Sequence, residues 1–418
     1  MNKTIPTKKQ LEFLDWEIGV FFHFGIRTFN EGHKDWDGEP MAVETFNPTS
    51  LDCEQWIKTA KAGGAKYTIL TTKHHDGFAL WPSAYTDYCV KNTPWKDGKG
   101  DVVREYVDAC RKYDIKVGLY YSPAQFGSKS MQGKEYDDYF INQISELLSN
   151  YGKIDYLWFD GCGSEDHEYD KDRIIKAIRG LQPEILIFSM WDPDTRWVGN
   201  EEGITPIDCK NTVAAAKTSI NEQEAQWLSE PKFLPYECDC KIRPNNWFYS
   251  ENDADTLRSL DNLLGLYDYS VGRGGNLLLN IGPDRRGLLP EKDAERFIEF
   301  GKAVKEQFSA PVDITVEKEG DVYTISSEKT VDISTVVIKE NLENGEGVKG
   351  FSLEYNYFVD MSLYCGKTIG NKRIVRIPAI GFGGDKKLKL KITDFDGEYT
   401  IDDIKVYPAR NVNKSVNG

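Results

Sequence analysis

The sequence lacks long apolar runs, paired cysteine motifs and an excess of positive charge, and each absence excludes a class of protein. None of its 418 residues belongs to an uninterrupted apolar run of membrane-spanning length, so we expect no transmembrane helix. The net charge of −15 disfavours nucleic acids and anionic membranes as partners. The first ten residues contain no apolar core of a signal peptide. We therefore expect a cytoplasmic protein if this N-terminus is native, and a secreted or cell-surface protein if a signal peptide was removed.

Cysteine and histidine are both scarce enough for their positions to be informative. None of the eight cysteines occurs in a C-x-x-C pair, so the sequence predicts no zinc framework. In a chain of this size, we expect reduced and mostly buried thiols rather than disulfides. Only five histidines are present.

The first three quarters of the chain alternate between apolar strands and amphipathic helices. The predicted strands cover 19–25, 65–77, 115–123, 154–161, 185–190, 233–237 and 276–283. The predicted helices cover 51–63, 102–113, 136–151, 173–181, 253–267 and 290–307. Seven or eight such units indicate parallel βαβ connections and a (β/α)₈ barrel over residues 1–309. A doubly wound sheet is the alternative, and the absence of G-x-G-x-x-G after any early strand weakens it.

The remaining residues, 310–418, have a different pattern. Segments such as 321–326, 335–338, 373–378 and 388–392 mostly alternate polar and apolar residues with period two, and Gly, Asn and Asp separate them. This pattern predicts an antiparallel β-sandwich. Because it contains no cluster of histidines or carboxylates, we expect it to support the barrel or to contact glycan.

Polar and aromatic residues gather where the early strands end. His23, the pair His74-His75 and Tyr121 close the first three strands, and Trp158 and Asp160 close the fourth. In a parallel barrel these ends meet at one mouth. Three interpretations compete: a metal site, a sugar site, or unrelated structural histidines. Judged from its own stretch alone, Asp160 would better suit the cap of a turn, and the other strand ends reverse that preference.

The spacing of the histidines favours the sugar site over the metal site. His74 and His75 are adjacent, so on a strand they point to opposite faces, which disfavours one shared ion. The first strand ends in His23-Phe24-Gly25 and has no H-x-H pair. Imidazoles, a phenol, an indole and a carboxylate match the hydroxyls and the apolar face of a pyranose. We therefore expect no metal and no cofactor.

Several runs resemble one known family, the α-L-fucosidases of glycoside hydrolase family 29. They are His23-Phe-Gly, Lys73-His-His-Asp-Gly-Phe78, Tyr120-Tyr-Ser122, Leu157-Trp-Phe-Asp-Gly161 and Gly274-Gly-Asn-Leu-Leu-Leu-Asn-Ile-Gly-Pro283. The resemblance extends over residues 10–307, and the K-H-H-D-G-F and W-F-D-G runs in that order are its most specific part. It implies the predicted barrel and a C-terminal sandwich.

The resemblance also implies a mechanism. Members of this family remove terminal α-L-fucose with retention, and by resemblance Asp160 is the nucleophile. The run Arg196-Trp-Val-Gly-Asn-Glu201 is similar to the R-W-x-G-N-E run of the branch that prefers α-1,3/1,4-linked fucose, so Glu201 is the expected acid/base. We expect the nearby charge of Asp160 to raise the pKa of Glu201. Glu237 is the alternative acid/base, and otherwise a strand-end carboxylate that binds sugar hydroxyls.

The remaining roles are implied residue by residue. His23, His74 and His75 bind fucose hydroxyls, and Tyr121 and Trp158 shape the pocket and pack on the sugar. Trp247 or Phe248 stacks on the fucose methyl group, and a core role for one of them is the equal alternative. Asp35 and Trp36 resemble a Glu-Trp pair of the family, with the shorter Asp in place of Glu. Arg196 reaches a ring hydroxyl or orients the acid.

The partner expected from this resemblance is a fucosylated, Lewis-type oligosaccharide or glycoconjugate. Three alternatives remain: a fucosidase of broad linkage tolerance, a fucose-binding protein without catalysis, and a metal-dependent barrel hydrolase.

Overall fold

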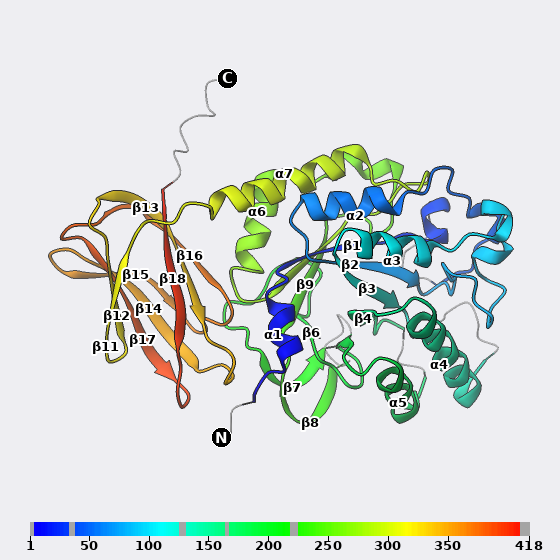
Figure 1. Cartoon of the computed structure of the whole chain (residues 1–418), viewed down its shortest axis with the longest axis horizontal. Coiled ribbons are helices and arrows are strands. Elements are labelled where there is room, and N and C mark those ends of the chain that lie inside the picture. The colour runs from blue at the N-terminus through cyan, green and yellow to red at the C-terminus, as the bar shows by residue number, and fades with distance from the viewer. Residues whose placement is uncertain (1–3, 33–37, 125–130, 164–166, 218–224, 410–418) are drawn as a thin grey trace.

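The computed structural model describes residues 4–32, 38–124, 131–163, 167–217 and 225–409. It consists of a barrel and a β-sandwich that lie side by side, with α7 running over the barrel toward the sandwich at the top of Figure 1. Within the described part of the chain, none of the helices has the length and apolar character needed to cross a membrane. All eight cysteines fall in the described ranges and are free thiols, as expected from their spacing.

Eight parallel strands form the barrel, in the order β5-β4-β3-β2-β1-β10-β9-β6. Their bounds are β1 Ile18–Phe22, β2 Tyr67–Lys73, β3 Lys116–Tyr121, β4 Tyr156–Phe159, β5 Leu186–Phe188, β6 Arg196–Trp197, β9 Tyr236–Lys241 and β10 Asn276–Asn280. The edge strands β5 and β6 meet through a bridge between Phe188 and Thr195, so the barrel is nearly closed. The predicted fold class is confirmed.

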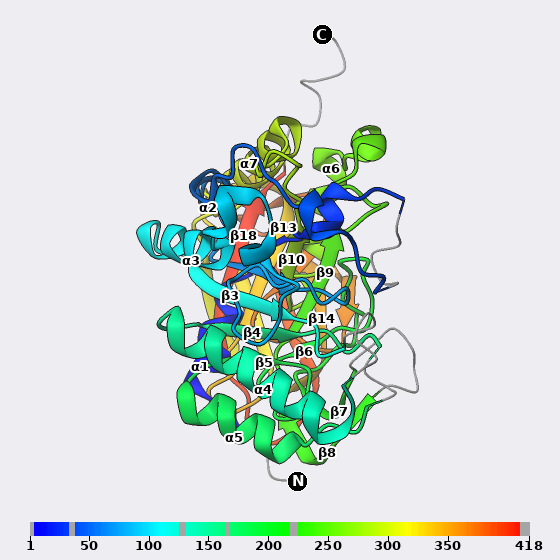
Figure 2. The same ribbon diagram turned by 90° about the vertical axis from the view of Figure 1, so that its right-hand side faces the viewer.

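Helices cover the outside of the barrel, as Figure 2 shows from its open end. They are α2 Cys53–Ala62, α3 Val102–Lys112, α4 Gly133–Asn150, α5 Lys171–Leu181, α6 Leu260–Tyr269 and α7 Glu291–Gln307. Short 3₁₀ helices lie at Ile26–Phe29, Val43–Thr45, Val90–Asn92, Trp95–Gly98 and Glu251–Thr256. Asp52, Asp101, Asp170 and Ser259 each accept a backbone N–H of the helix that follows, which explains where α2, α3, α5 and α6 begin.

The second half of the barrel departs from the regular alternation. β6 has only two residues, and the described residues after β5 and β6 contain no helix before β9. An antiparallel hairpin of β7 (Thr212–Lys217) and β8 (Ala225–Phe233) stands there instead. The strand predicted at 233–237 begins later, at Tyr236, because Pro235 has no N–H for the ladder. The helix predicted at 253–267 divides into a 3₁₀ turn and α6.

The amino-terminal end of the barrel is closed by aromatic side chains. Helix α1 (Lys8–Leu14) and the turn after it place Phe13 and Trp16 against Tyr67 and Tyr156, with ring centroids 5.3–6.4 Å apart. Asn276 donates its side-chain N–H to the carbonyl of Phe13 over 2.7 Å. The interior is therefore solid at this end, and space for a ligand remains at the other.

The C-terminal strands form two antiparallel sheets around a shared core. One sheet has the order β11-β12-β17-β14-β15 and the other β16-β13-β18. The strands are β11 Thr315–Glu319, β12 Val322–Ser326, β13 Val331–Glu340, β14 Val348–Asn356, β15 Asp360–Gly366, β16 Arg373–Phe382, β17 Lys387–Phe395 and β18 Ile401–Pro408. Ile325, Val336 and Leu390 belong to the core between the sheets. The domain division at 309/310 stays a prediction and falls between α7 and β11.

Candidate active site

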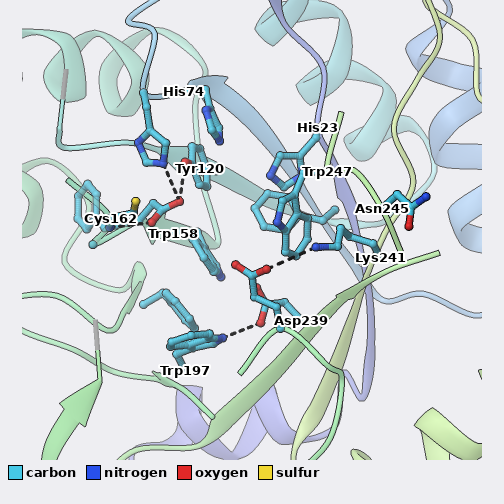
Figure 3. Close-up of a pocket in the computed structure, with 17 residues that line it drawn as sticks. His23, His74, Tyr120, Trp158, Cys162, Trp197, Asp239, Lys241, Asn245 and Trp247 are labelled. Atoms are coloured by element: carbon cyan, nitrogen blue, oxygen red, sulfur yellow. Dashed lines mark hydrogen bonds and ion pairs between the residues drawn. The ribbon is translucent and has the colours of Figure 1, made fainter. Parts of the chain in front are cut away.

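A pocket of about 540 Å³ opens at the carboxyl ends of the barrel strands. In Figure 1 the arrows of β2 and β3 point away from the sandwich, so this mouth lies at the far end of the molecule. Figure 3 shows side chains from β1, β2, β3, β4 and β9 converging on it. His23, His74, His75, Trp158, Asp160, Glu201 and Trp247 line the pocket. Seven of the twelve site residues predicted from the sequence therefore meet in one place.

Three donors hold the Asp160 carboxylate at the end of β4. Oδ1 accepts the backbone N–H of Cys162 over 2.9 Å, and Oδ2 accepts the phenol of Tyr120 over 2.8 Å. His75 Nε2 lies 3.4 Å from the same Oδ2. Burial would raise the pKa of Asp160, but His75, Cys162 and Tyr120 together hold it below its ordinary value. Asp160 is consequently ionised at neutral pH.

A hydrogen bond to Ser122 determines how the His75 ring is oriented. Ser122 donates its hydroxyl to the carbonyl of Ala124 over 2.9 Å, so it accepts the 2.6 Å bond from His75 Nδ1. His75 thus carries a proton on Nδ1 while Nε2 faces the Asp160 carboxylate. Ser122 therefore orients the His75 ring toward the Asp160 carboxylate.

The structure contradicts the argument that His74 and His75 face opposite sides. Strand β2 ends at Lys73, after a break in its pairing with β3 between Thr71 and Lys73, so alternation does not extend to the two histidines. Both line the pocket. Among the described residues, one ligand atom from each of His74, His75 and Asp160 lies within 4.8 Å of the others, so this trio could approach one metal ion.

His23 is held in one tautomer by Asn280 at the end of β10. The Asn280 amide donates to the carbonyl of Trp247 over 2.7 Å, and its oxygen accepts His23 Nδ1 over 2.7 Å. Burial lowers the pKa of His23 to about 3, against the opposing effect of Asn280. His23 is therefore neutral, and its Nε2 remains a hydrogen-bond acceptor.

Four rings stack in sequence along one wall of the pocket. His74 lies on Tyr120 at 5.4 Å and 9°, Tyr120 on Trp158 at 5.4 Å and 22°, and Trp158 on Phe188 at 4.2 Å and 12°. Burial lowers the pKa of His74 well below its ordinary value, so this ring is neutral. The stack offers the apolar surface that the C–H face of a sugar requires.

Strand β9 places three polar side chains on the inner face at increasing height. Glu237 is lowest and fully buried, with Trp158 Nε1 2.8 Å from its Oε1 and the Tyr67 hydroxyl on its Oε2. Asp239 and Lys241 follow at two-residue intervals and line the pocket. Glu237 thus lies beneath the pocket and does not line it, so its expected contact with sugar, or its role as acid/base, stays a prediction that this placement does not support. Burial raises the pKa of Glu237 to about 7.

Glu201 reaches the pocket from the loop after β6. Its Oε2 lies 3.4 Å from Lys241 Nζ, and its side chain is 42% exposed. Asp239 accepts the indole N–H of Trp197 over 2.6 Å, and burial, followed by the charge of Glu201, raises the pKa of Asp239 well above its ordinary value. This wall therefore combines the accessible side chain of Glu201 with Lys241 and the buried Asp239.

Two of the predicted residues point away from the pocket, and two lie outside the described residues. Tyr121 donates to Gln143 of α4 over 2.6 Å on the outer face of β3. Arg196 bonds the carbonyl of Lys210 over 2.7 Å and packs over the ring of Tyr236. Asp35 and Trp36 fall in the segment 33–37, outside the described residues.

Several lining residues were not predicted from the sequence. They are Phe21, Tyr120, Phe159, Gly161, Cys162, Phe188, Trp197, Asp239, Lys241 and Asn245. Alternation along a strand would have identified three of them, and two are in β9, where Asp239 and Lys241 follow Glu237 with period two. The same rule places Tyr120 on the inner face of β3, two residues beyond Gly118.

The family model and two plant relatives that match this chain carry the same description. A family model described as α-L-fucosidase matches residues 3–307. α-L-Fucosidase 1 of Arabidopsis thaliana is 38% identical over 315 residues, which are 73% of this chain and 61% of that protein. A putative α-L-fucosidase 1 of Oryza sativa subsp. japonica is 37% identical over 73% of this chain and 60% of its own length. The chain thus spans about three fifths of these plant proteins.

Solved structures match nearly the whole chain. A putative α-L-fucosidase from Bacteroides thetaiotaomicron has 33% identity and a TM-score of 0.89 over 97% of this chain and 98% of its own. A family 29 fucosidase from Ruminococcus gnavus, solved in complex with fucose, has 25% identity and a TM-score of 0.82 over 98% and 95% of the two chains. The similarity therefore includes the C-terminal sandwich as well as the barrel.

Proposed function

The chain belongs to the α-L-fucosidase family of glycoside hydrolases, and from this premise we propose that it is a retaining exo-α-L-fucosidase. Its proposed substrates are terminal α-1,3/1,4-linked L-fucose residues of branched, Lewis-type glycans. The observation that carries the proposal is the Asp160 carboxylate, held by three donors in a pocket that Glu201 also lines.

Asp160 serves as the nucleophile in this proposal. A carboxylate oxygen attacks the anomeric carbon of fucose, and an ester bond forms as the glycosidic C–O bond breaks. The lowered pKa of Asp160 keeps it ionised for the attack. Because His75, Tyr120 and the Cys162 N–H fix its position, little reorganisation is needed when the bond forms.

Glu201 serves as the acid and then as the base. It gives a proton to the leaving oxygen in the first step, and in the second takes a proton from the water that attacks the fucosyl ester. Lys241, 3.4 Å away, stabilises the negative charge that Glu201 holds between these steps. Glu237 does not compete for this role, because it lies below the pocket with both oxygens hydrogen-bonded.

Fucose fits the remaining walls. The neutral rings of His23 and His74 accept hydrogen bonds from hydroxyls, and the stack of Tyr120, Trp158 and Phe188 covers an apolar face. The fucose complex of the Ruminococcus gnavus relative supports this occupant. Asp35 and Trp36 stay predicted contacts.

The linkage preference rests on the loop after β6. Its R-W-V-G-N-E run is similar to that of the α-1,3/1,4 branch, and both Trp197 and Glu201 of this run line the pocket. A panel of α-1,2-, α-1,3-, α-1,4- and α-1,6-fucosides, each with and without a neighbouring galactose, tests the preference. Equal turnover across the panel would favour a fucosidase of broad linkage tolerance.

The activity itself is tested with Asp160→Gly and an aryl α-L-fucoside. Turnover should fall at least about a thousandfold, and added azide should restore release of the aryl group with formation of a fucosyl azide. Unchanged turnover in this variant would remove Asp160 from the mechanism. Fucose binding by the wild-type protein without release of free fucose from any fucosylated oligosaccharide would favour a binding protein instead.

A further inference from the structure

The loop of residues 198–211, which we call the Glu201 loop, connects the mouth of the barrel with the β-sandwich. It leaves β6 beside the pocket, where Glu201 lines the wall, and ends where β7 begins at Thr212. Near the mouth its backbone is tied to β9: Val198 N–H donates to the carbonyl of Glu237 over 3.0 Å, and Gly203 N–H to that of Asp239 over 3.1 Å.

The far end of the Glu201 loop is bound by the sandwich. Glu346 accepts the backbone N–H of Asn211 over 2.9 Å, its side-chain N–H over 2.7 Å and the backbone N–H of Thr212 over 3.3 Å. Thr368 donates its hydroxyl to the carbonyl of Cys209 over 3.2 Å. One carboxylate of the sandwich therefore satisfies three donors at the end of the loop.

A second carboxyl group inside the sandwich fixes both of these contacts. Glu340, at the end of β13, accepts the N–H of Gly347 over 2.6 Å and of Val348 over 2.9 Å with Oε1, and that of Gly370 over 3.3 Å with Oε2. Glu340 is buried. It thereby joins the segment that carries Glu346 to the segment that carries Thr368.

We propose that the sandwich positions the acid/base, with Glu346 as the positioning residue that holds the Glu201 loop in register with the pocket. This inference rests on the proposed role of Glu201. The other barrel connections are mostly helices packed on the sheet, whereas β6 has two residues and no helix follows it within the described residues. The contacts with β9 hold the loop at Val198 and Gly203, whereas Glu346 and Thr368 hold its far end. A displacement of about 1 Å at an acid/base is enough to reduce turnover about a hundredfold.

The simpler alternative is that Glu346 only joins the barrel to the sandwich. Other pairs already do this without touching the Glu201 loop. Arg376 of β16 holds both carboxylate oxygens of Asp268 on α6, at 2.7 and 2.8 Å, and Lys372 pairs with Glu17 before β1. These contacts provide a matched control, because the loss of Arg376 loosens the interface and leaves the loop's partners in place.

The test compares Glu346→Gln with Arg376→Ala on two substrates. One is an aryl fucoside with an activated leaving group, which needs little acid assistance, and the other is a fucosylated trisaccharide, which needs a proton from Glu201. We expect Glu346→Gln to lower kcat/KM about 10- to 100-fold on the trisaccharide and less than about threefold on the aryl fucoside. Arg376→Ala should change both by less than about threefold. Asn211→Ala, which alters the loop side of the same contact, should repeat the selective loss if Glu346→Gln folds poorly.

A double variant shows whether Glu346 acts through Glu201. Glu201→Gln alone should lower kcat/KM selectively on the trisaccharide. Adding Glu346→Gln to Glu201→Gln should then lower kcat/KM no further. If Glu201→Gln shows no selective loss, the proposed acid/base assignment fails. If Glu201→Gln is selective but Glu346→Gln lowers both substrates equally, or adds its full effect to the double variant, the positioning role is overturned while the acid/base stands.

Discussion

Tyr120 donates its hydroxyl to Asp160 Oδ2 across 2.8 Å, whereas the next residue, Tyr121, donates to Gln143 outside the barrel. The two phenols are adjacent in β3 and chemically identical, and both are buried. Burial raises the pKa of each well above its ordinary value, so both remain protonated donors. Only Tyr120 contacts Asp160, the proposed nucleophile, and this difference between the two phenols can be measured.

Tyr120→Phe should impair catalysis. Without the phenol, Asp160 loses one of three donors, and its pKa should rise because that hydrogen bond contributes to lowering it. We expect kcat/KM to fall about 10- to 100-fold and the acid limb of its pH profile to move to higher pH. A pH–rate profile of the variant with an aryl fucoside checks both effects.

Tyr121→Phe is the matched control for this prediction. It removes the bond to Gln143 and should cost about 1 kcal/mol of folding free energy while leaving kcat/KM within about twofold. A larger loss of activity in Tyr121→Phe than in Tyr120→Phe would contradict the placement of the two phenols.

Asn280 should be required for binding because it sets the tautomer of His23. Asn280→Ala removes the acceptor from His23 Nδ1, so the ring can rotate or carry its proton on Nε2. We expect KM to rise about tenfold with a smaller change in kcat. Asn276→Ala, on the same strand, loses a bond to Phe13 at the closed end, so it should lower stability without raising KM.

The fold could be predicted because its determinants are local and periodic. Strand and helix patterns along residues 1–309 specify parallel units, and the period-two pattern after Pro311 specifies antiparallel sheets. The exceptions have physical reasons. β6 has two residues, too few to show any period, and the hairpin of β7 and β8 occupies a position where alternation predicts a helix.

The sequence predicted the residues of the pocket correctly where their placement depends on lying at the end of a strand. His23, Trp158 and Asp160 line the pocket as expected. Glu237 was misplaced because β9 continues to Lys241, so a residue taken for the end of a strand lies near its beginning. Arg196 was misplaced because its inner or outer orientation depends on the register of β6 with β9, which no local pattern reveals.

Zinc should inhibit the enzyme without being required by it. One ligand atom from each of His74, His75 and Asp160 lies within 4.8 Å of the others, and neutral imidazole and carboxylate are ligands that Zn²⁺ accepts. We expect Zn²⁺ to raise KM competitively with fucose, a chelator to reverse this, and the chelator alone to leave turnover unchanged. The control variant His167→Ala removes a different His–Asp pair, so Zn²⁺ should inhibit it as strongly as it inhibits the wild-type protein. Loss of all activity on chelation would favour the metal-dependent hydrolase.

Glu237→Gln should change how stability depends on pH. Glu237 is fully buried and its pKa is raised from an ordinary 4.5 to about 7. Between these pH values the folded state holds a proton that the unfolded state has released, so the free energy of unfolding falls as pH rises through this window. Glutamine is neutral throughout and can still accept the N–H of Trp158, so the variant avoids this loss.

The free energy of unfolding of Glu237→Gln should therefore equal that of the wild-type protein below pH 5 and exceed it above pH 7. The difference follows from the pKa shift and amounts to at most about 3 kcal/mol. Urea denaturation of both proteins at pH 5 and pH 8 measures it. The double variant Glu237→Gln/Tyr67→Phe separates charge from packing, because it also removes the phenol that faces Oε2. A stability difference independent of pH would mean that Glu237 is already ionised at pH 5 in the folded protein.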